Sequence, residues 1–220
     1  MFDYYSTEPQ QEDFERTVTD DQGNQYSYGY EKLLKGADIP LVRIHPGCAM
    51  ICNNAFEQCA ALQSVFIPES VRAIGAYAFS GCIMLSSIMI PESVTDMGIH
   101  VFDGCRSLEK VVLPHKLSFL PHCTFFGCSA LECVDVPEGV TIIGKGAFVH
   151  CDSLKKVHLP NSLTGLWHDV FYGCHSLERI LISRETYERL LLNQPDNELT
   201  LFYLRQMIDF NGPESSPQAT

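Results

Sequence analysis

Residues Ala78 to Gly98 read AFSGCIMLSSIMIPESVTDMG, and this stretch decides the fold. Its phenylalanine is followed three residues later by a cysteine and three residues after that by a leucine. The same spacing recurs in six copies, each 23 residues long, with no insertion. The phenylalanines of the six copies are Phe56, Phe79, Phe102, Phe125, Phe148 and Phe171, and their cysteines are Cys59, Cys82, Cys105, Cys128, Cys151 and Cys174. The chain is therefore built from a tandem repeat.

In each copy, two apolar residues then flank one residue that should face outward, as in Ile88-Met89-Ile90. In the first five copies a proline follows. This pattern is typical of a short β-strand and its end. A repeat of this length with one strand is typical of a leucine-rich solenoid, whose coils bury their apolar faces only by stacking. We predict an α/β-type repeat solenoid with a continuous parallel β-sheet on its inner face. The Ala-Phe-x-x-Cys segments should form short helices or turns, and the phenylalanines should stack inside the core.

The repeat resembles the BspA-type leucine-rich repeat family, whose unit reads roughly A-F-x-x-C-x-x-L-x-x-I-x-I-P-x-S-V-x-x-I-G. The copy from Ala78 to Gly98 matches this unit nearly throughout, and the likeness covers about residues 42–182. For function, the resemblance implies non-catalytic protein recognition, often adhesion at a bacterial surface.

Four regions follow from the repeat and its limits. Residues 1–41 should form a partly flexible N-terminal capping segment with a strand over Gln25–Tyr30, and residues 42–182 should form the solenoid, a half coil plus six copies. Residues 183–211 should form a helical C-terminal cap, and residues 212–220 a disordered tail. In this cap, Ser183 is the expected N-cap of a helix through Leu192. A second helix should cover roughly 197–210, with its apolar face made by Leu199, Phe202, Tyr203 and Met207.

Charge and hydropathy exclude several classes of partner. The 220 residues contain 15 Lys and Arg against 27 Asp and Glu, a net charge of -12. No basic stripe is present, so we expect no binding to nucleic acid. No apolar stretch approaches the ~18 residues of a membrane span, so we expect no membrane insertion. The first residues lack a secretory signal, so we expect a cytoplasmic protein, with the extracellular surface as the alternative.

Motifs that could carry chemistry are weak here, so we expect no enzyme activity and no cofactor. The segment 139–146 resembles a phosphate-binding loop, but Gly146 stands where a Ser or Thr must hold magnesium. His168-Asp169 has no accompanying nucleophile motif. Buried packing explains the cysteine column best, ahead of disulfide pairing or metal binding. A zinc site at His100, His122 and Cys123 is a further hypothesis, and exposed polar histidines are its alternative.

One residue of each strand must face outward between the two buried ones. In successive coils these residues are Arg43, Phe66, Met89, Val112, Asp135, His158 and Leu181. Exposed strand positions are usually polar, so three adjacent apolar side chains indicate a contact surface. We predict that Phe66, Met89 and Val112, extended by Asp135 and His158, bind an unidentified protein or peptide. The alternatives are that such side chains simply suit a sheet, or that the N-terminal segment covers them. A structural or self-associating solenoid is the competing function, and a surface adhesin is another if the chain is exported.

Overall fold

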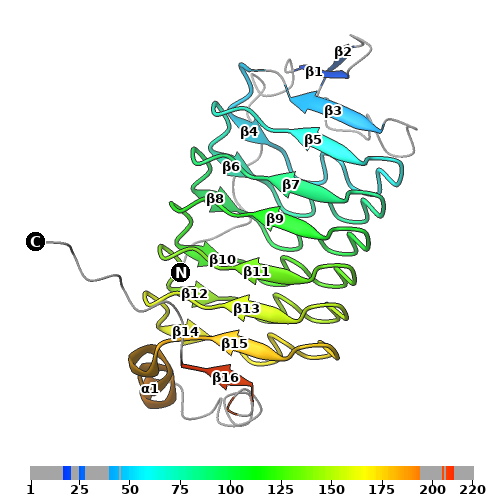
Figure 1. The fold of residues 1–220 in the computed structure, drawn as a ribbon. Helices are drawn as coiled ribbons and strands as arrows, with labels where there is room; N and C mark the ends of the chain where they lie inside the picture. The colour runs from blue at the N-terminus through cyan, green and yellow to red at the C-terminus, as the bar shows by residue number, and fades with distance from the viewer. Residues whose placement is uncertain are drawn as a thin grey trace, which may run out of the picture.

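The computed structural model describes residues 17–20, 25–27, 40–44, 46–193, 205 and 207–210. In the repeat region the chain winds into stacked coils, each carrying one longer and one shorter strand (Figure 1). The predicted solenoid of parallel strands is confirmed.

The longer strands lie side by side and form what we call the front sheet. They are β3 (Leu41–Ile44), β5 (Ser64–Phe66), β7 (Ser87–Met89), β9 (Lys110–Val112), β11 (Cys133–Asp135), β13 (Lys156–His158) and β15 (Arg179–Leu181). Paired strands are parallel and offset by one repeat, so that Arg43 lies beside Phe66 and Met89 beside Val112. The hydrogen-bond ladder is divided into β3–β5, β7–β9 and β11–β13–β15 rather than running unbroken through all seven strands.

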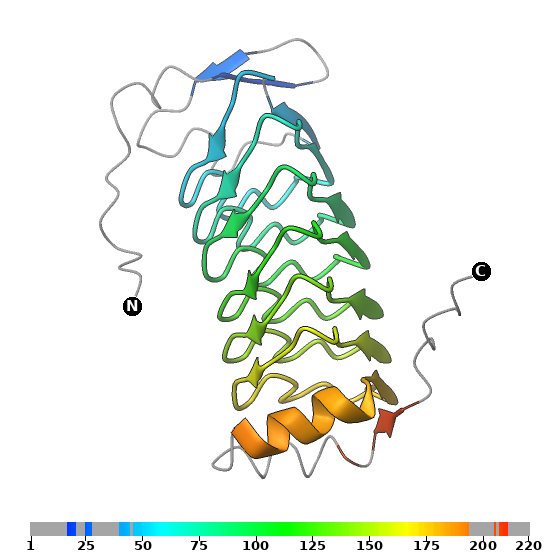
Figure 2. The same ribbon diagram turned by 90° about the vertical axis from the view of Figure 1, so that its left-hand side faces the viewer.

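A second column of two-residue strands runs along the opposite side of the coils (Figure 2). It consists of β4 (Met50–Ile51), β6 (Ala73–Ile74), β8 (Asp96–Met97), β10 (Phe119–Leu120), β12 (Ile142–Ile143) and β14 (Gly165–Leu166). The sequence predicted only an apolar pair in these places. Two residues are too few to show the alternation by which a strand is recognised.

The Ala-Phe-x-x-Cys segments are turns, which decides between the two predicted conformations. Their backbone groups bond partly to the next coil: the Phe79 amide donates to the Val101 carbonyl at 2.9 Å. The chain reverses through left-handed residues, such as His100 with φ of 57° and Gly104 with φ of 71°. Hydrogen bonds that run between coils replace those that a helix would make within itself.

The phenylalanines stack through the centre of the solenoid, as the repeat predicted. Ring centroids of successive residues from Phe56 to Phe171 lie 5.2–5.6 Å apart, and the ring planes are nearly parallel. The first five rings are fully buried. Offset stacking of aromatic rings adds to the free energy of apolar burial, so this column joins neighbouring coils along the core.

At the N-terminal end, two antiparallel strands extend the edge of the front sheet. β1 (Thr17–Asp20) pairs with β3 on one side and with β2 (Gln25–Ser27) on the other. The strand predicted over Gln25–Tyr30 is thus seen as β2 in its first three residues, and the rest lies outside the described residues. Pairing with β1 satisfies the backbone groups that an open edge of β3 would leave unpaired.

At the C-terminal end, the predicted first helix is confirmed as α1 (Arg184–Asn193), which lies across the last coil (Figure 2). Its N-cap is Ser183, whose Oγ accepts a hydrogen bond from the Thr186 amide at 3.2 Å. Arg189 donates from Nε to the Leu163 carbonyl at 3.2 Å, which fixes the helix to the solenoid.

The prediction of a second helix over roughly 197–210 is wrong at its C-terminal end. Instead of helix, β16 (Ile208–Asp209) pairs parallel with β15, and the Ile180 amide donates to the Met207 carbonyl at 2.8 Å. Pairing satisfies the backbone of β15, and this tertiary gain outweighs the helical spacing of the apolar residues. Leu199, Phe202 and Tyr203, and the predicted tail 212–220, lie outside the described residues.

Candidate protein-contact surface on the front sheet

The outward-facing residues of the front sheet form a single column, which we call the front column. Its members are Arg43, Phe66, Met89, Val112, Asp135, His158 and Leu181. Three adjacent apolar members are the most unusual, because Met89 is 69% exposed, Phe66 57% and Val112 50%. The alternation of the strands causes this exposure: Val65 and Ile67, on either side of Phe66, point into the core.

Charged groups stand at the two ends of this apolar centre. The Arg43 guanidinium lies over the Phe66 ring, with Cζ 5.9 Å from the ring centroid, within range of a cation–π contact. At the other end, Asp135 Oδ1 lies 3.9 Å from His158 Nδ1. The front column therefore presents a cation, then three apolar side chains, then a carboxylate beside a histidine.

A second exposed column runs beside the front column, and the sequence analysis did not single it out. We call it the flanking column: Ser64, Ser87, Lys110, Cys133, Lys156 and Arg179. The signal for it was available, because residues two apart in a strand share a face. The flanking column is polar beside the apolar centre and cationic toward the C-terminal coils.

All five residues predicted to bind a partner lie in the front column. Phe66, Met89, Val112 and Asp135 are exposed, and His158 is half-buried. The described strands of the N-terminal segment, β1 and β2, continue the front sheet beyond β3.

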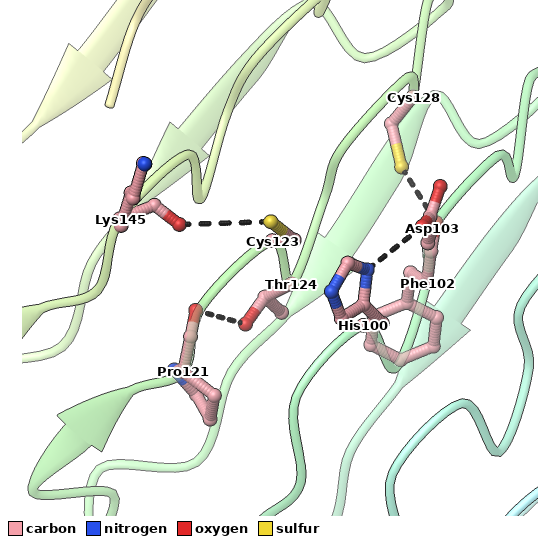
Figure 3. A network of polar contacts seen from close by, with 8 residues as sticks. All are labelled: His100, Phe102, Asp103, Pro121, Cys123, Thr124, Cys128 and Lys145. Atoms are coloured by element: carbon pink, nitrogen blue, oxygen red, sulfur yellow. Dashed lines mark hydrogen bonds and ion pairs between the residues drawn. The ribbon is translucent and has the colours of Figure 1, made fainter. Parts of the chain in front are cut away.

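The cysteine column is part of the core. Cys105 Sγ donates to the Phe79 carbonyl at 3.1 Å, and Cys128 Sγ to the Phe102 carbonyl at the same distance (Figure 3). Burial raises the pKa of Cys59 to about 11 and that of Cys105 to about 12. All ten cysteines belong to the described residues and are present as thiols. A thiol that donates to a buried carbonyl satisfies that group and packs as a small apolar side chain.

The residues of the hypothetical zinc site bind other groups of the protein. His100 Nδ1 lies 2.8 Å from Asp103 Oδ2, and Cys123 Sγ lies 3.7 Å from the Lys145 carbonyl (Figure 3). The Lys145 amide donates to His122 Nδ1 at 2.7 Å. Within the described residues, no three His, Cys, Asp or Glu side chains gather in a way that could hold a metal ion.

The only described α-helix of appreciable length is α1, with 10 residues. In the described part of the chain, no helix is long and apolar enough to span a membrane.

Comparisons with known proteins agree with the repeat. The family model of the BspA type leucine-rich repeat region matches residues 49–186 in six copies. No curated protein matches the sequence. Among solved structures, a leucine-rich repeat protein of T. pallidum is 26% identical, with a TM-score of 0.62 over 86% of this chain and 97% of that chain. A leucine-rich repeat protein from Bacteroides ovatus is 28% identical, with a TM-score of 0.48 over 77% of this chain and 56% of that one.

The family model covers well over half of the 220 residues, and the T. pallidum protein has the same solenoid architecture. The chain belongs to the BspA-type leucine-rich repeat family.

Proposed function

We propose that the protein is an interaction module that binds another protein chain on the front column. Membership of the family suggests a protein-interaction or structural module, and solenoids of this family are generally non-enzymatic. The proposal rests on the exposure of Phe66, Met89 and Val112 on adjacent strands. Large exposed apolar patches on a folded surface mark sites of interaction.

Burial of these side chains supplies the binding energy in this proposal. Each large apolar side chain contributes roughly 1.5–3 kcal/mol when it is fully removed from water. The strands hold the three residues at one-coil intervals, so little conformational entropy is lost when a partner docks. Asp135 and His158, 3.9 Å apart, then add polar contacts that select the partner.

The test compares protein capture by two double variants with capture by the unchanged chain. Phe66→Ser with Met89→Ser removes the apolar centre, and we expect capture of the main partner from an extract of the source cells to weaken at least ~100-fold. Ile83→Ser with Met84→Ser is the matched control, because these side chains are 44% and 48% exposed in the turn before β7 and do not belong to the front column. Circular dichroism checks that both variants fold.

Mass spectrometry of the captured proteins decides the outcome. Loss of one protein in the front-column variant, with retention in the control, supports the proposal. Equal capture by the front-column variant and the unchanged chain would place the contact surface elsewhere.

We further propose that the protein works in a reducing compartment, as expected for the cytoplasm. Support comes from the column cysteines, which as thiols donate to core carbonyls and would lose these bonds on oxidation. Isolation of the protein under conditions that trap thiols, followed by mass spectrometry, tests this. Disulfide-linked pairs in the isolated protein would contradict it.

A further inference from the structure

Over its first five residues, from Arg43 to Asp135, the front column reverses its chemistry about Met89. Two coils before Met89 stands the cation of Arg43, and two coils after it stands the carboxylate of Asp135. One coil to either side are the apolar residues Phe66 and Val112. A surface with this order is complementary to itself when one copy is turned end for end.

We propose that the occupant of the front column is a second copy of this chain, bound antiparallel about a two-fold axis that passes over Met89. This inference rests on the proposed function, because it names the partner of the same surface. Arg43 would face Asp135 of the second copy, Phe66 would face Val112, and Met89 would face itself. The Arg43–Asp135 and Phe66–Val112 contacts each occur twice, and the Met89 contact lies on the axis, as a two-fold interface requires.

The flanking column is compatible with this arrangement. With the axis parallel to the strands, each column faces its own counterpart in reverse order. Ser64 then faces Lys110 of the second copy, and Ser87 faces itself. Along these five coils, no like charges face each other across the interface. Like charges in such positions would lower the affinity of the complex.

The opposite orientation, with both solenoids running in the same direction, has no such complementarity. It would set Arg43 level with Arg43 of the second copy and Asp135 level with Asp135.

The size of the surface sets the expected affinity. From Arg43 to Asp135 the column crosses four coil spacings, about 19 Å at ~4.8 Å for each strand. Such a strip buries less area than the ~1,600 Å² of a standard stable interface. We therefore expect a weak dimer, with a dissociation constant of roughly 10 to 1,000 micromolar.

Charge reversal with reciprocal rescue tests the arrangement. Sedimentation equilibrium of the full chain from about 10 micromolar to about 1 millimolar should show the mass rising from 24.7 kDa toward twice that value. Arg43→Glu alone and Asp135→Arg alone should each weaken association at least ~10-fold. The variant with both changes should associate as the unchanged chain does, because opposite charges would again face each other across the interface, with their signs exchanged.

Recovery in the doubly changed variant supports the antiparallel dimer, since only paired contact between these two positions explains it. A chain that stays monomeric at every concentration overturns the inference, as does a dimer that either single change leaves intact or that the double change fails to restore. The proposed function has a separate readout. Loss of a different captured protein in the Phe66→Ser, Met89→Ser variant would keep the proposed function even where self-association fails.

Discussion

Two columns of the solenoid follow the same 23-residue period, but only one of them repeats the same residue in every coil. The buried column places phenylalanine in all six coils, and its rings stack 5.2–5.6 Å apart. The front column has a different residue in each coil, from Arg43 through Met89 to Leu181. Each buried position has nearly the same surroundings, so one side chain fits all of them. The solvent-facing positions have no such requirement, and their variation is available for recognition.

We expect the largest difference between the two columns when one phenylalanine in each is shortened. Phe102→Ala should lower the free energy of unfolding by about 3–5 kcal/mol, because it leaves a cavity between two stacked rings. Phe66→Ala removes the same atoms from a side chain that is 57% exposed, and should lower it by less than about 1 kcal/mol. Urea unfolding followed by circular dichroism measures both. Similar losses in the two variants would mean that the front column belongs to the core.

The cysteines allow the same comparison with a smaller side chain. Cys105→Ala removes a buried thiol and its 3.1 Å bond to the Phe79 carbonyl, and should cost about 1–2 kcal/mol of stability. Cys133→Ala, on the exposed flanking column, should change stability by less than about 0.5 kcal/mol. Urea midpoints of the two variants, measured under reducing conditions, provide the check. A neutral Cys105→Ala would show that the carbonyl finds another donor at no cost.

The smallest expected effect concerns pH and His122. Burial, followed by the nearby positive charges of His100 and Lys145, lowers the pKa of His122 below its usual 6.5. The unfolded chain therefore takes up the proton first, so the stability contributed by neutral His122 is present above pH 6.5 and is lost as the pH falls below it. Protonation also removes the acceptor of the Lys145 amide bond.

A matched variant isolates this effect. Asn53 occupies the equivalent repeat position and accepts the Ala76 amide through Oδ1 at 2.7 Å, so His122→Asn should keep the bond without titrating. Between about pH 7 and pH 5, the unchanged chain should lose more stability than the His122→Asn variant. Parallel stability curves for the two proteins would remove His122 as the cause.

Much of this architecture could be predicted because all six copies repeat the same spacing of apolar residues. The stacked phenylalanines, the strands of the front sheet and the exposure of Met89 all follow from period and alternation. The two-residue strands, such as β8 (Asp96–Met97), could not be predicted, since they are shorter than any recognisable pattern. β16 could not be predicted either, because it forms by pairing with the edge of β15. Local residue spacing does not encode such a tertiary contact.

Of the candidate site, the sequence predicted the membership of the front column but not its electrostatic surroundings. The contact between Arg43 and the Phe66 ring, and the proximity of Asp135 to His158, depend on side-chain conformations. The reversal of chemistry about Met89 was visible in the sequence, but it has meaning only once the five residues are known to share one face.

An open front column should contribute little to the stability of the fold. Equilibrium urea unfolding of the Phe66→Ser, Met89→Ser variant measures this contribution. We expect a free energy of unfolding within about 1 kcal/mol of that of the unchanged chain, because both side chains already face water. A loss of about 3 kcal/mol or more, as expected for core positions, would show that another part of the chain covers the column and that the surface is not open.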